Sequence, residues 1–258
     1  MSKAEKFGAE LYAALRDRRT VPPLIARDAS LTVEDAYAIS LDFLSRRRKD
    51  GEKVVGKKIG VTSKAVQDML GVHQPDFGFL TDWMHIEGDI DVDAKALIAP
   101  RAEAEIAFIL KDSLNGPGIT AADVIAATES IAPCFEIVDS RITDWKIGIV
   151  DTVSDNASCG VFILGEARAD PRELDLPGLH VTVTKNGAPL SEGHGAAVQG
   201  SPAEAVAWLA NTLGTFGVTL DAGDIILSGS LVPLADAVKG DVFEMTLHGV
   251  GSCTAKFV

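Results

Sequence analysis

Two glutamates stand two residues apart in residues 101–110, an otherwise apolar segment typical of a buried strand. Residues two apart in a strand share a face, so Glu103 and Glu105 point the same way. Carboxylates about 7 Å apart on a half-buried face repel each other and lose solvation. A bound hard cation would reverse that balance, because Mg²⁺ prefers oxygen ligands. The alternative is a solvated edge strand on which Arg101 offsets the charge.

A third carboxylate, Glu136, interrupts the apolar segment 134–138. Glutamates are rarely buried unless they are paired or bound to a metal. The three glutamates together predict an all-carboxylate Mg²⁺ site. The structural alternative is an ion pair between Glu136 and Arg141, for which Asp139 competes.

Two lysines lie on the short apolar segment 54–59, which is expected to be a strand. Alternation predicts that one of Lys57 and Lys58 faces inward and the other faces solvent. An inward lysine close to a cation would have its pKa lowered, which suits a general base. Two surface lysines are the alternative.

Two further polar residues are ambiguous between structure and chemistry. Asp76 lies in residues 74–78 (Gln-Pro-Asp-Phe-Gly), which we expect to form a turn. Asp76 either caps this turn or, if the loop covers a site, shuttles a proton. Ser158 ends residues 155–158 (Asp-Asn-Ala-Ser), which either cap a turn or contact a substrate.

The elements that must position these residues fall into two parts. Helical spacing and stop signals predict helices over 3–19 and 32–49, and Asn186-Gly187 predicts a hairpin turn. The expected strands cover 54–59, 101–110, 135–138, 160–164, 180–185, 224–227 and 242–247; further helices are expected over 63–70, 121–127 and 203–213. Because the strands do not alternate regularly with helices, we predict an α+β fold. A helical arm (1–50) precedes a mixed β core (51–258) that forms one structural unit.

The composition excludes several classes of protein. The chain has 258 residues, of which 47% are hydrophobic, so a packed globular core is expected. A net charge of -13 disfavours nucleic acid as a partner. We expect a cytoplasmic protein without a membrane partner, because long apolar runs, a signal core and paired cysteines are lacking. Phosphate-loop, dinucleotide-binding and nucleophile-elbow motifs are missing, and the histidines lack zinc-ligand spacing.

Eight segments give the chain a resemblance to a known family. They are 54–63 (Val-Val-Gly-Lys-Lys-Ile-Gly-Val-Thr-Ser), 72–78 (Val-His-Gln-Pro-Asp-Phe-Gly), 100–108 (Pro-Arg-Ala-Glu-Ala-Glu-Ile-Ala-Phe), 136–141 (Glu-Ile-Val-Asp-Ser-Arg), 144–146 (Asp-Trp-Lys), 151–160 (Asp-Thr-Val-Ser-Asp-Asn-Ala-Ser-Cys-Gly), 223–226 (Gly-Asp-Ile-Ile) and 249–252 (Gly-Val-Gly-Ser). Over almost its whole length the chain resembles the hydratase/decarboxylase branch of the fumarylacetoacetate hydrolase superfamily. Segments 74–78 and 144–160 look most like the hydratases of that branch.

The resemblance implies a mixed β-roll core with an N-terminal helical region and a divalent metal, Mg²⁺ or Mn²⁺. By motif, the metal ligands are Glu103, Glu105 and Glu136. The active-site lysine is Lys58 and the active-site aspartate is Asp76, and Ser158 contacts the substrate carboxylate. The implied reaction is the hydration of 2-hydroxypenta-2,4-dienoate in aromatic meta-cleavage catabolism. Homo-oligomers, pentamers or decamers, and an aldolase or decarboxylase partner are implied as well.

Three alternatives stay open at this stage. The first is decarboxylation of 4-oxalocrotonate, which uses the same metal chemistry. The second is hydrolysis of a C–C bond, which needs a water-activating base that no histidine motif here supplies. The third is a non-catalytic metal-binding module that scaffolds a partner aldolase.

Overall fold

The N-terminal region folds into three helices, two of which begin at good capping residues. The computed structural model describes residues 1–63, 67, 72–86 and 91–258. The helices are α1 (Lys3–Asp17), α2 (Leu24–Arg27) and α3 (Val33–Lys49). Ser2 and Thr32 each cap a helix N-terminus and exchange hydrogen bonds with an acidic residue three positions later. The apolar faces of these helices then pack on one another.

The strands in the rest of the described chain form two mixed sheets. The larger has the order β2-β1-β10-β5-β6-β7-β3, with β11 paired to β5, and the smaller has the order β4-β13-β12-β8-β9. The strands are β1 (Val54–Gly60), β2 (Asp76–Thr81), β3 (His85–Ile86), β4 (Asp91–Val92), β5 (Pro100–Leu110), β6 (Thr128–Asp139), β7 (Cys159–Leu164), β8 (His180–Lys185), β9 (Ala188–His194), β10 (Ile225–Ser230), β11 (Ala235–Asp236), β12 (Val242–Leu247) and β13 (Gly251–Phe257). The pairs β1–β10, β3–β7 and β4–β13 are parallel, and the other pairs are antiparallel.

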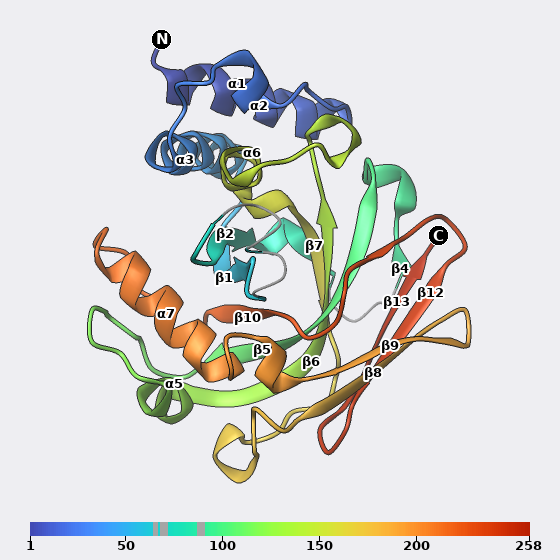
Figure 1. Cartoon of the computed structure of the whole chain (residues 1–258). Coiled ribbons are helices and arrows are strands. Elements are labelled where there is room, and N and C mark those ends of the chain that lie inside the picture. Colours follow the sequence, from blue (N-terminus) through green and yellow to red (C-terminus); the bar gives the residue numbers. More distant parts are fainter. Residues whose placement is uncertain (64–66, 68–71, 87–90) are drawn as a thin grey trace.

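The layers meet around β5 and β6, which curve through the centre of the molecule (Figure 1). Helices α5 (Ala121–Ala127) and α7 (Pro202–Gly214) pack against each other beside the large sheet. Helix α6 (Ile149–Ser154) packs under α3, where its Val150 and Val153 join the apolar cluster of the N-terminal helices. The helical region and the strands are thus joined through α6.

Strand β5 contributes to two apolar clusters at once. Its even-numbered residues, from Ala102 to Leu110, lie in the main core between the sheets. On the opposite face, Ala107 packs in a smaller cluster with Leu80, Cys134 and Leu227. The face that carries Glu103 and Glu105 therefore borders buried apolar surface, as the alternation predicts.

The α+β fold with an N-terminal helical region is confirmed, with several local differences. Strand β6 is longer than expected, and the elements not anticipated include α2, α6, β2, β3, β4, β11 and β13. Asp76 begins strand β2, so the expectation of a turn at this aspartate is wrong. Most of the helix expected over 63–70 lies outside the described residues.

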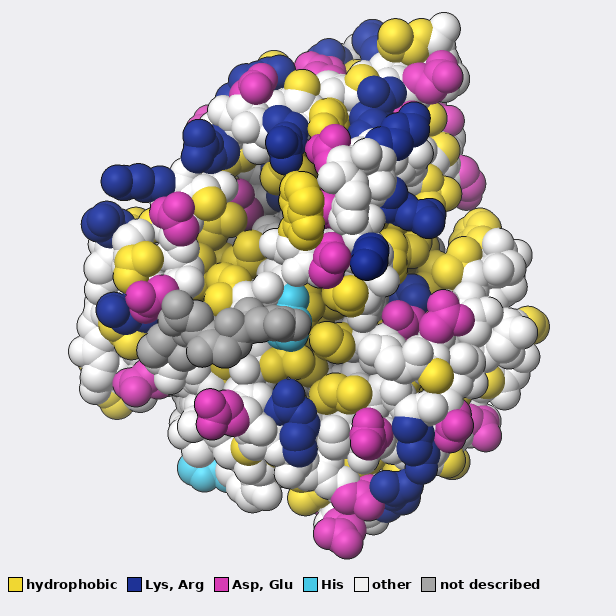
Figure 2. All heavy atoms as spheres, turned by 180° about the vertical axis from the view of Figure 1, so that it is seen from behind, with side chains coloured by type: hydrophobic (Ala, Val, Ile, Leu, Met, Phe, Trp, Pro, Cys, Tyr) yellow, Lys and Arg dark blue, Asp and Glu magenta, His cyan; other side chains and the backbone are white. Residues whose placement is uncertain are grey.

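The surface carries mixed charge rather than a single sign. On the face seen in Figure 2, lysine and arginine side chains alternate with aspartate and glutamate. None of the helices in the described ranges is long and apolar enough to cross a membrane. The three cysteines are buried and unbonded to one another.

Candidate active site

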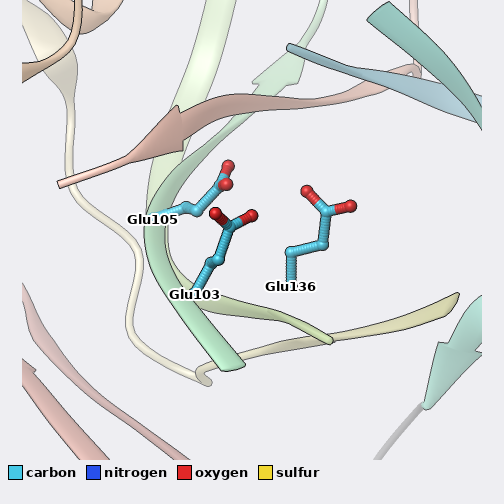
Figure 3. A group of neighbouring side chains, drawn as sticks. All are labelled: Glu103, Glu105 and Glu136. Atoms are coloured by element: carbon cyan, nitrogen blue, oxygen red, sulfur yellow. The ribbon is translucent and has the colours of Figure 1, made fainter. Parts of the chain in front are cut away.

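Adjacent strands bring the three glutamates together. Glu103 on β5 and Glu136 on β6 are direct cross-strand partners, and Glu105 follows two residues along the same face. Figure 3 shows the three carboxylates pointing toward one another. One oxygen from each lies within 4.8 Å of the others. The sheet register thus assembles a cluster of hard oxygen donors from two strands.

Several of these oxygens are buried without a hydrogen-bond donor. Among the described residues, Oε1 of Glu105 and both carboxylate oxygens of Glu136 lack a hydrogen-bond partner. The second oxygen of Glu105 accepts a hydrogen bond from the Gly229 amide at 2.8 Å. Buried polar atoms are normally satisfied, and an all-carboxylate donor set matches hard divalent cations. The residues present therefore fit a divalent cation.

Burial and crowding raise the pKa values of two of the three glutamates. Burial raises the pKa of Glu103 to about 7, and the Glu136 carboxylate adds to the rise. Burial, followed by repulsion from Glu136, raises the pKa of Glu105 well above its ordinary value. A cation in the cluster would favour the ionised forms and reverse both shifts.

Lys58 lies beside this cluster. Its Nζ is 3.3 Å from Oε1 of Glu136, an ion-pair contact without hydrogen-bond alignment. Burial lowers the pKa of Lys58, but Glu136, Asp76 and Glu103 outweigh burial and raise it above its ordinary value. These carboxylates oppose the lowering that we expected from a nearby cation, and they keep the lysine charged.

Lys57 does not face solvent, contrary to the expectation from alternation. Both lysines are 3% exposed. The Lys57 ammonium forms a buried ion pair with Asp224 and donates to the Thr219 carbonyl at 3.2 Å. The strand is covered on both faces, so alternation separates the two side chains without exposing either.

Asp76 faces Lys58 across a glycine. Asp76 is opposite Gly60 in the antiparallel pair of β1 and β2, and Lys58 is opposite Gly78. A methyl group at Gly60 would collide with Oδ1 of Asp76 and lie 3.2 Å from Nζ of Lys58. Burial raises the pKa of Asp76, and the Lys58 charge opposes that rise. Gly60 therefore leaves the space in which the two charged groups meet.

Ser158 ends an unusual left-handed turn. Asn156, Ala157 and Ser158 have φ of 55°, 48° and 52°, which costs energy in residues other than glycine. The Asn156 side chain bonds both the N–H and the carbonyl of Phe79, at 2.8 and 2.9 Å. The Ser158 hydroxyl donates to Asp155 at 3.2 Å. These contacts fix the serine beside strand β2.

The ion pairs that were the structural alternatives to a metal site do not form. Arg141 is fully buried and pairs with Asp155 at 2.6 Å, not with Glu136 or the Asp139 carboxylate. Arg101 pairs with Asp236 at 2.8 Å, not with the glutamates of its own strand. Asp236 is distant from Arg101 in sequence, and Asp155 is separated from Arg141 by an irregular turn. The spacing of residues therefore could not indicate either partner.

A cavity of about 390 Å³ brings most of the site together. Its walls include four of the six site residues expected from the sequence: Lys58, Asp76, Glu103 and Ser158. The walls also include Arg101, Trp145 and Leu234, to which we assigned no site role. Trp145 belongs to a motif that carries the resemblance and could have been found that way. Nothing in the sequence marks Leu234.

Comparison with known proteins identifies the family. The family model described as fumarylacetoacetate (FAA) hydrolase C-terminal matches residues 64–258. The chain belongs to the fumarylacetoacetate hydrolase family. This match covers β2, β5 and β6, which carry four of the six expected site residues, and the turn that ends at Ser158. The matched residues include the larger part of the strands described above.

Curated relatives within this family are named hydratases. A 2-hydroxyhexa-2,4-dienoate hydratase of Comamonas testosteroni is 61% identical over 255 residues, covering 98% of this chain and 97% of the relative. A 2-hydroxypent-2,4-dienoate hydratase of Pseudomonas putida is 61% identical over 214 residues, covering 83% of this chain and 96% of the relative.

A solved structure is similar over the whole fold. It is 4-oxalocrotonate decarboxylase from Pseudomonas putida G7, complexed with magnesium and adipate. It has a TM-score of 0.95 and 35% identity, and the alignment covers 99% of this chain and 97% of that chain. The N-terminal helices are therefore part of the shared fold.

Proposed function

We propose that this fumarylacetoacetate hydrolase family member is a hydro-lyase that hydrates 2-hydroxypenta-2,4-dienoate to 4-hydroxy-2-oxopentanoate. The reaction belongs to the meta-cleavage catabolism of aromatic compounds. The observation that carries the proposal is 61% identity to a named dienoate hydratase over nearly the whole of both chains. A second relative at the same identity is named for the five-carbon substrate.

We propose that Glu103, Glu105 and Glu136 hold a divalent cation. Their mutual proximity and the unpartnered buried oxygens support this ligand set. When bound, the metal supplies Lewis-acid stabilisation of the negative charge that develops at the C2 oxygen of the substrate. We propose Mg²⁺, with Mn²⁺ as a substitute, because both accept hard carboxylate oxygens.

The roles of Lys58, Asp76 and Ser158 follow from their charges and positions. Lys58 is charged and buried beside Glu136, so it donates a hydrogen bond to the substrate oxygen at C2. Asp76 has a raised pKa and faces Lys58, so it holds or accepts the proton of the water that adds at C4. Ser158 on the cavity wall donates to the substrate carboxylate.

Decarboxylation of 4-oxalocrotonate is the second candidate function. The observation that favours it is the TM-score of 0.95 with a 4-oxalocrotonate decarboxylase. Both reactions start from a 2-oxygenated acid at the same cluster, so the six site residues do not distinguish them.

The test compares the two substrates in the same purified protein. In ¹⁸O-labelled water with Mg²⁺, the product from 2-hydroxypenta-2,4-dienoate carries the label at the C4 hydroxyl, and 4-oxalocrotonate releases little CO₂. Rapid CO₂ release with slow dienoate turnover supports the decarboxylase instead. Turnover of neither substrate supports a non-catalytic scaffold.

We propose a cytoplasmic homo-oligomer built from five-fold rings, on the resemblance alone. Light scattering of the purified protein should give the mass of five or ten chains. Co-purification with an aldolase or a decarboxylase of the same pathway tests the partner.

A further inference from the structure

An arginine at the mouth of the active-site cavity already has a carboxylate partner. Asp236 on β11 lies directly opposite Arg101 on β5, and its Oδ1 is 2.8 Å from the Arg101 Nε. The side chain of Asp236 is 81% exposed and that of Arg101 is 30% exposed. The pair therefore stands where the cavity meets solvent.

The same arginine lies over the ring of a tryptophan. The Arg101 guanidinium carbon is 4.5 Å from the centre of the Trp145 ring. The indole N–H donates to the Ala99 carbonyl at 2.9 Å, and both Asp144 and Trp145 adopt left-handed backbone conformations. A fixed indole on one side and Asp236 at Nε leave the guanidinium little freedom to turn toward a ligand.

Arg101 stands at the distal end of the substrate path. Arg101 and Glu103 share one face of β5 and line the same cavity, about 7 Å apart along the strand. An extended six-carbon acid covers a comparable length. With its C1 and C2 oxygens beside Glu103 and Lys58, such an acid therefore ends near Arg101, Trp145 and Leu234.

The charge at this end is balanced. Arg101 and Lys58 are the lysine and arginine residues among the described residues that line the cavity, and Lys58 is beside Glu136. At the mouth, Asp236 offsets Arg101, and Asp144 is paired with Lys146 at 2.9 Å. A second substrate carboxylate would have to share Arg101 with Asp236, whose negative charge would repel it. An uncharged tail would lie against Trp145 and Leu234 at no such cost.

We propose that Asp236, by neutralising the charge of Arg101, makes the site select 2-oxygenated acids with an uncharged distal end over dicarboxylates. This specificity role rests on the proposed function, because it assumes that the acid end lies at the glutamates. Asp236 is a specificity-determining residue that acts through Arg101.

The test uses two inert ligands that differ only at the distal end. 2-Oxohexanoate ends in a methyl group, and 2-oxoadipate ends in a second carboxylate. Their dissociation constants are measured by calorimetry on the full-length, Mg²⁺-loaded protein at low ionic strength. The wild-type protein should bind 2-oxohexanoate more tightly than 2-oxoadipate.

Asp236→Asn removes the charge and keeps the side-chain volume. The affinity ratio should shift toward 2-oxoadipate by about fivefold, the size of one exposed ion-pair contact. Adding Arg101→Gln to this variant should abolish the shift. Asp170→Asn is the matched control, because Asp170 forms a similar exposed pair with Arg172 at 2.6 Å and is not among the cavity-lining residues.

The outcomes separate the two levels of the proposal. An unchanged ratio in Asp236→Asn, or a shift that persists without Arg101, overturns the role of Asp236 and leaves the proposed function intact. Failure of every variant to bind either 2-oxo acid overturns the proposed function and the specificity role together.

Discussion

Lys57 and Asp224 form a buried ion pair on the side of β1 opposite Lys58. Adjacent lysines of one strand thus have different partners: one pairs with an aspartate away from the cavity, and the other lies among the site carboxylates. Substitution should separate a structural lysine from a catalytic one.

Lys58→Ala should lower kcat by at least ~10²-fold, the usual cost of removing a donor that stabilises charge developing on a substrate oxygen. Lys57→Ala should instead lower the free energy of unfolding by about 3 kcal/mol, because it leaves Asp224 buried and unpaired. Steady-state kinetics and urea unfolding measure the two effects. Near-normal kcat in Lys58→Ala would show that the lysine is misassigned.

Glu136→Gln should weaken metal binding by at least tenfold, because it removes one of three clustered charges and retains the side-chain volume. Calorimetric titration with Mn²⁺ measures the change in metal affinity without relying on turnover. Glu129→Gln is the control, since Glu129 is exposed on the same strand. Equal affinities in the two variants would exclude Glu136 as a ligand.

Metal-free protein should lose stability as the pH rises from about 4.5 to about 7. The raised pKa of Glu103, about 7, means that the folded state holds a proton that the unfolded state releases at lower pH. Glu105 and Asp76 act in the same direction, whereas exposed carboxylates with lowered pKa, such as Asp28, act below this window.

Urea unfolding at pH 5, 6 and 7.5, with chelator, tests this slope. Saturating Mg²⁺ should stabilise the protein most at the highest pH, because binding requires ionised ligands. Glu103→Gln should flatten the chelator curve. A slope of opposite sign would mean that these carboxyl groups are ionised in the metal-free fold.

Gly60→Ala should lower kcat on the order of 10²-fold, the typical cost of displacing reacting groups by about 1 Å. The added methyl group collides with Asp76 next to Lys58. Gly148→Ala is the control, because its nearest contact would be an ordinary 3.7 Å to Asp151. If both variants keep full activity, the close approach of Asp76 and Lys58 is not needed for turnover.

Ser158→Ala should raise KM about fivefold with a smaller change in kcat, equivalent to one hydrogen bond of about 1 kcal/mol. Ser154→Ala serves for comparison, since the Ser154 hydroxyl is buried without a hydrogen-bond partner in the described part of the chain. If the role of Ser158 is purely structural, Ser158→Ala should lower the unfolding temperature and leave KM unchanged.

The strand pattern predicted the carboxylate cluster because it depends on local alternation. Glu103 and Glu105 share a face by their spacing, and the apolar residues around Glu136 indicated burial. Glu103 and Glu136 are cross-strand partners because of the β5–β6 register. The spacing of residues within one strand does not determine that register. The burial expected of both apolar segments nevertheless grouped the three glutamates as one site, and the resemblance assigned the same three residues.

Contacts between segments that are distant in the sequence could not be predicted. Asp224 pairs with Lys57, and Asp155 pairs with Arg141. Both ion pairs depend on where the loops that carry the aspartates lie against the sheet. Asp76 follows a proline, so local turn preference competed with pairing to β1, and the pairing prevailed. The boundary at residue 50, the roles of the six site residues and the oligomer stay predictions.

Strand β5 supplies the core with one set of side chains and the site with the other, and this limits how the protein can diverge. Between Ala102 and Phe108, a substitution affects either packing or ligand chemistry, so selection leaves few neutral positions. Its solvent-edge neighbours, Leu234 and Asp236, are much freer to vary. New substrate preferences should therefore arise by substitutions at the mouth of the cavity, while the three clustered glutamates stay constant across descendants.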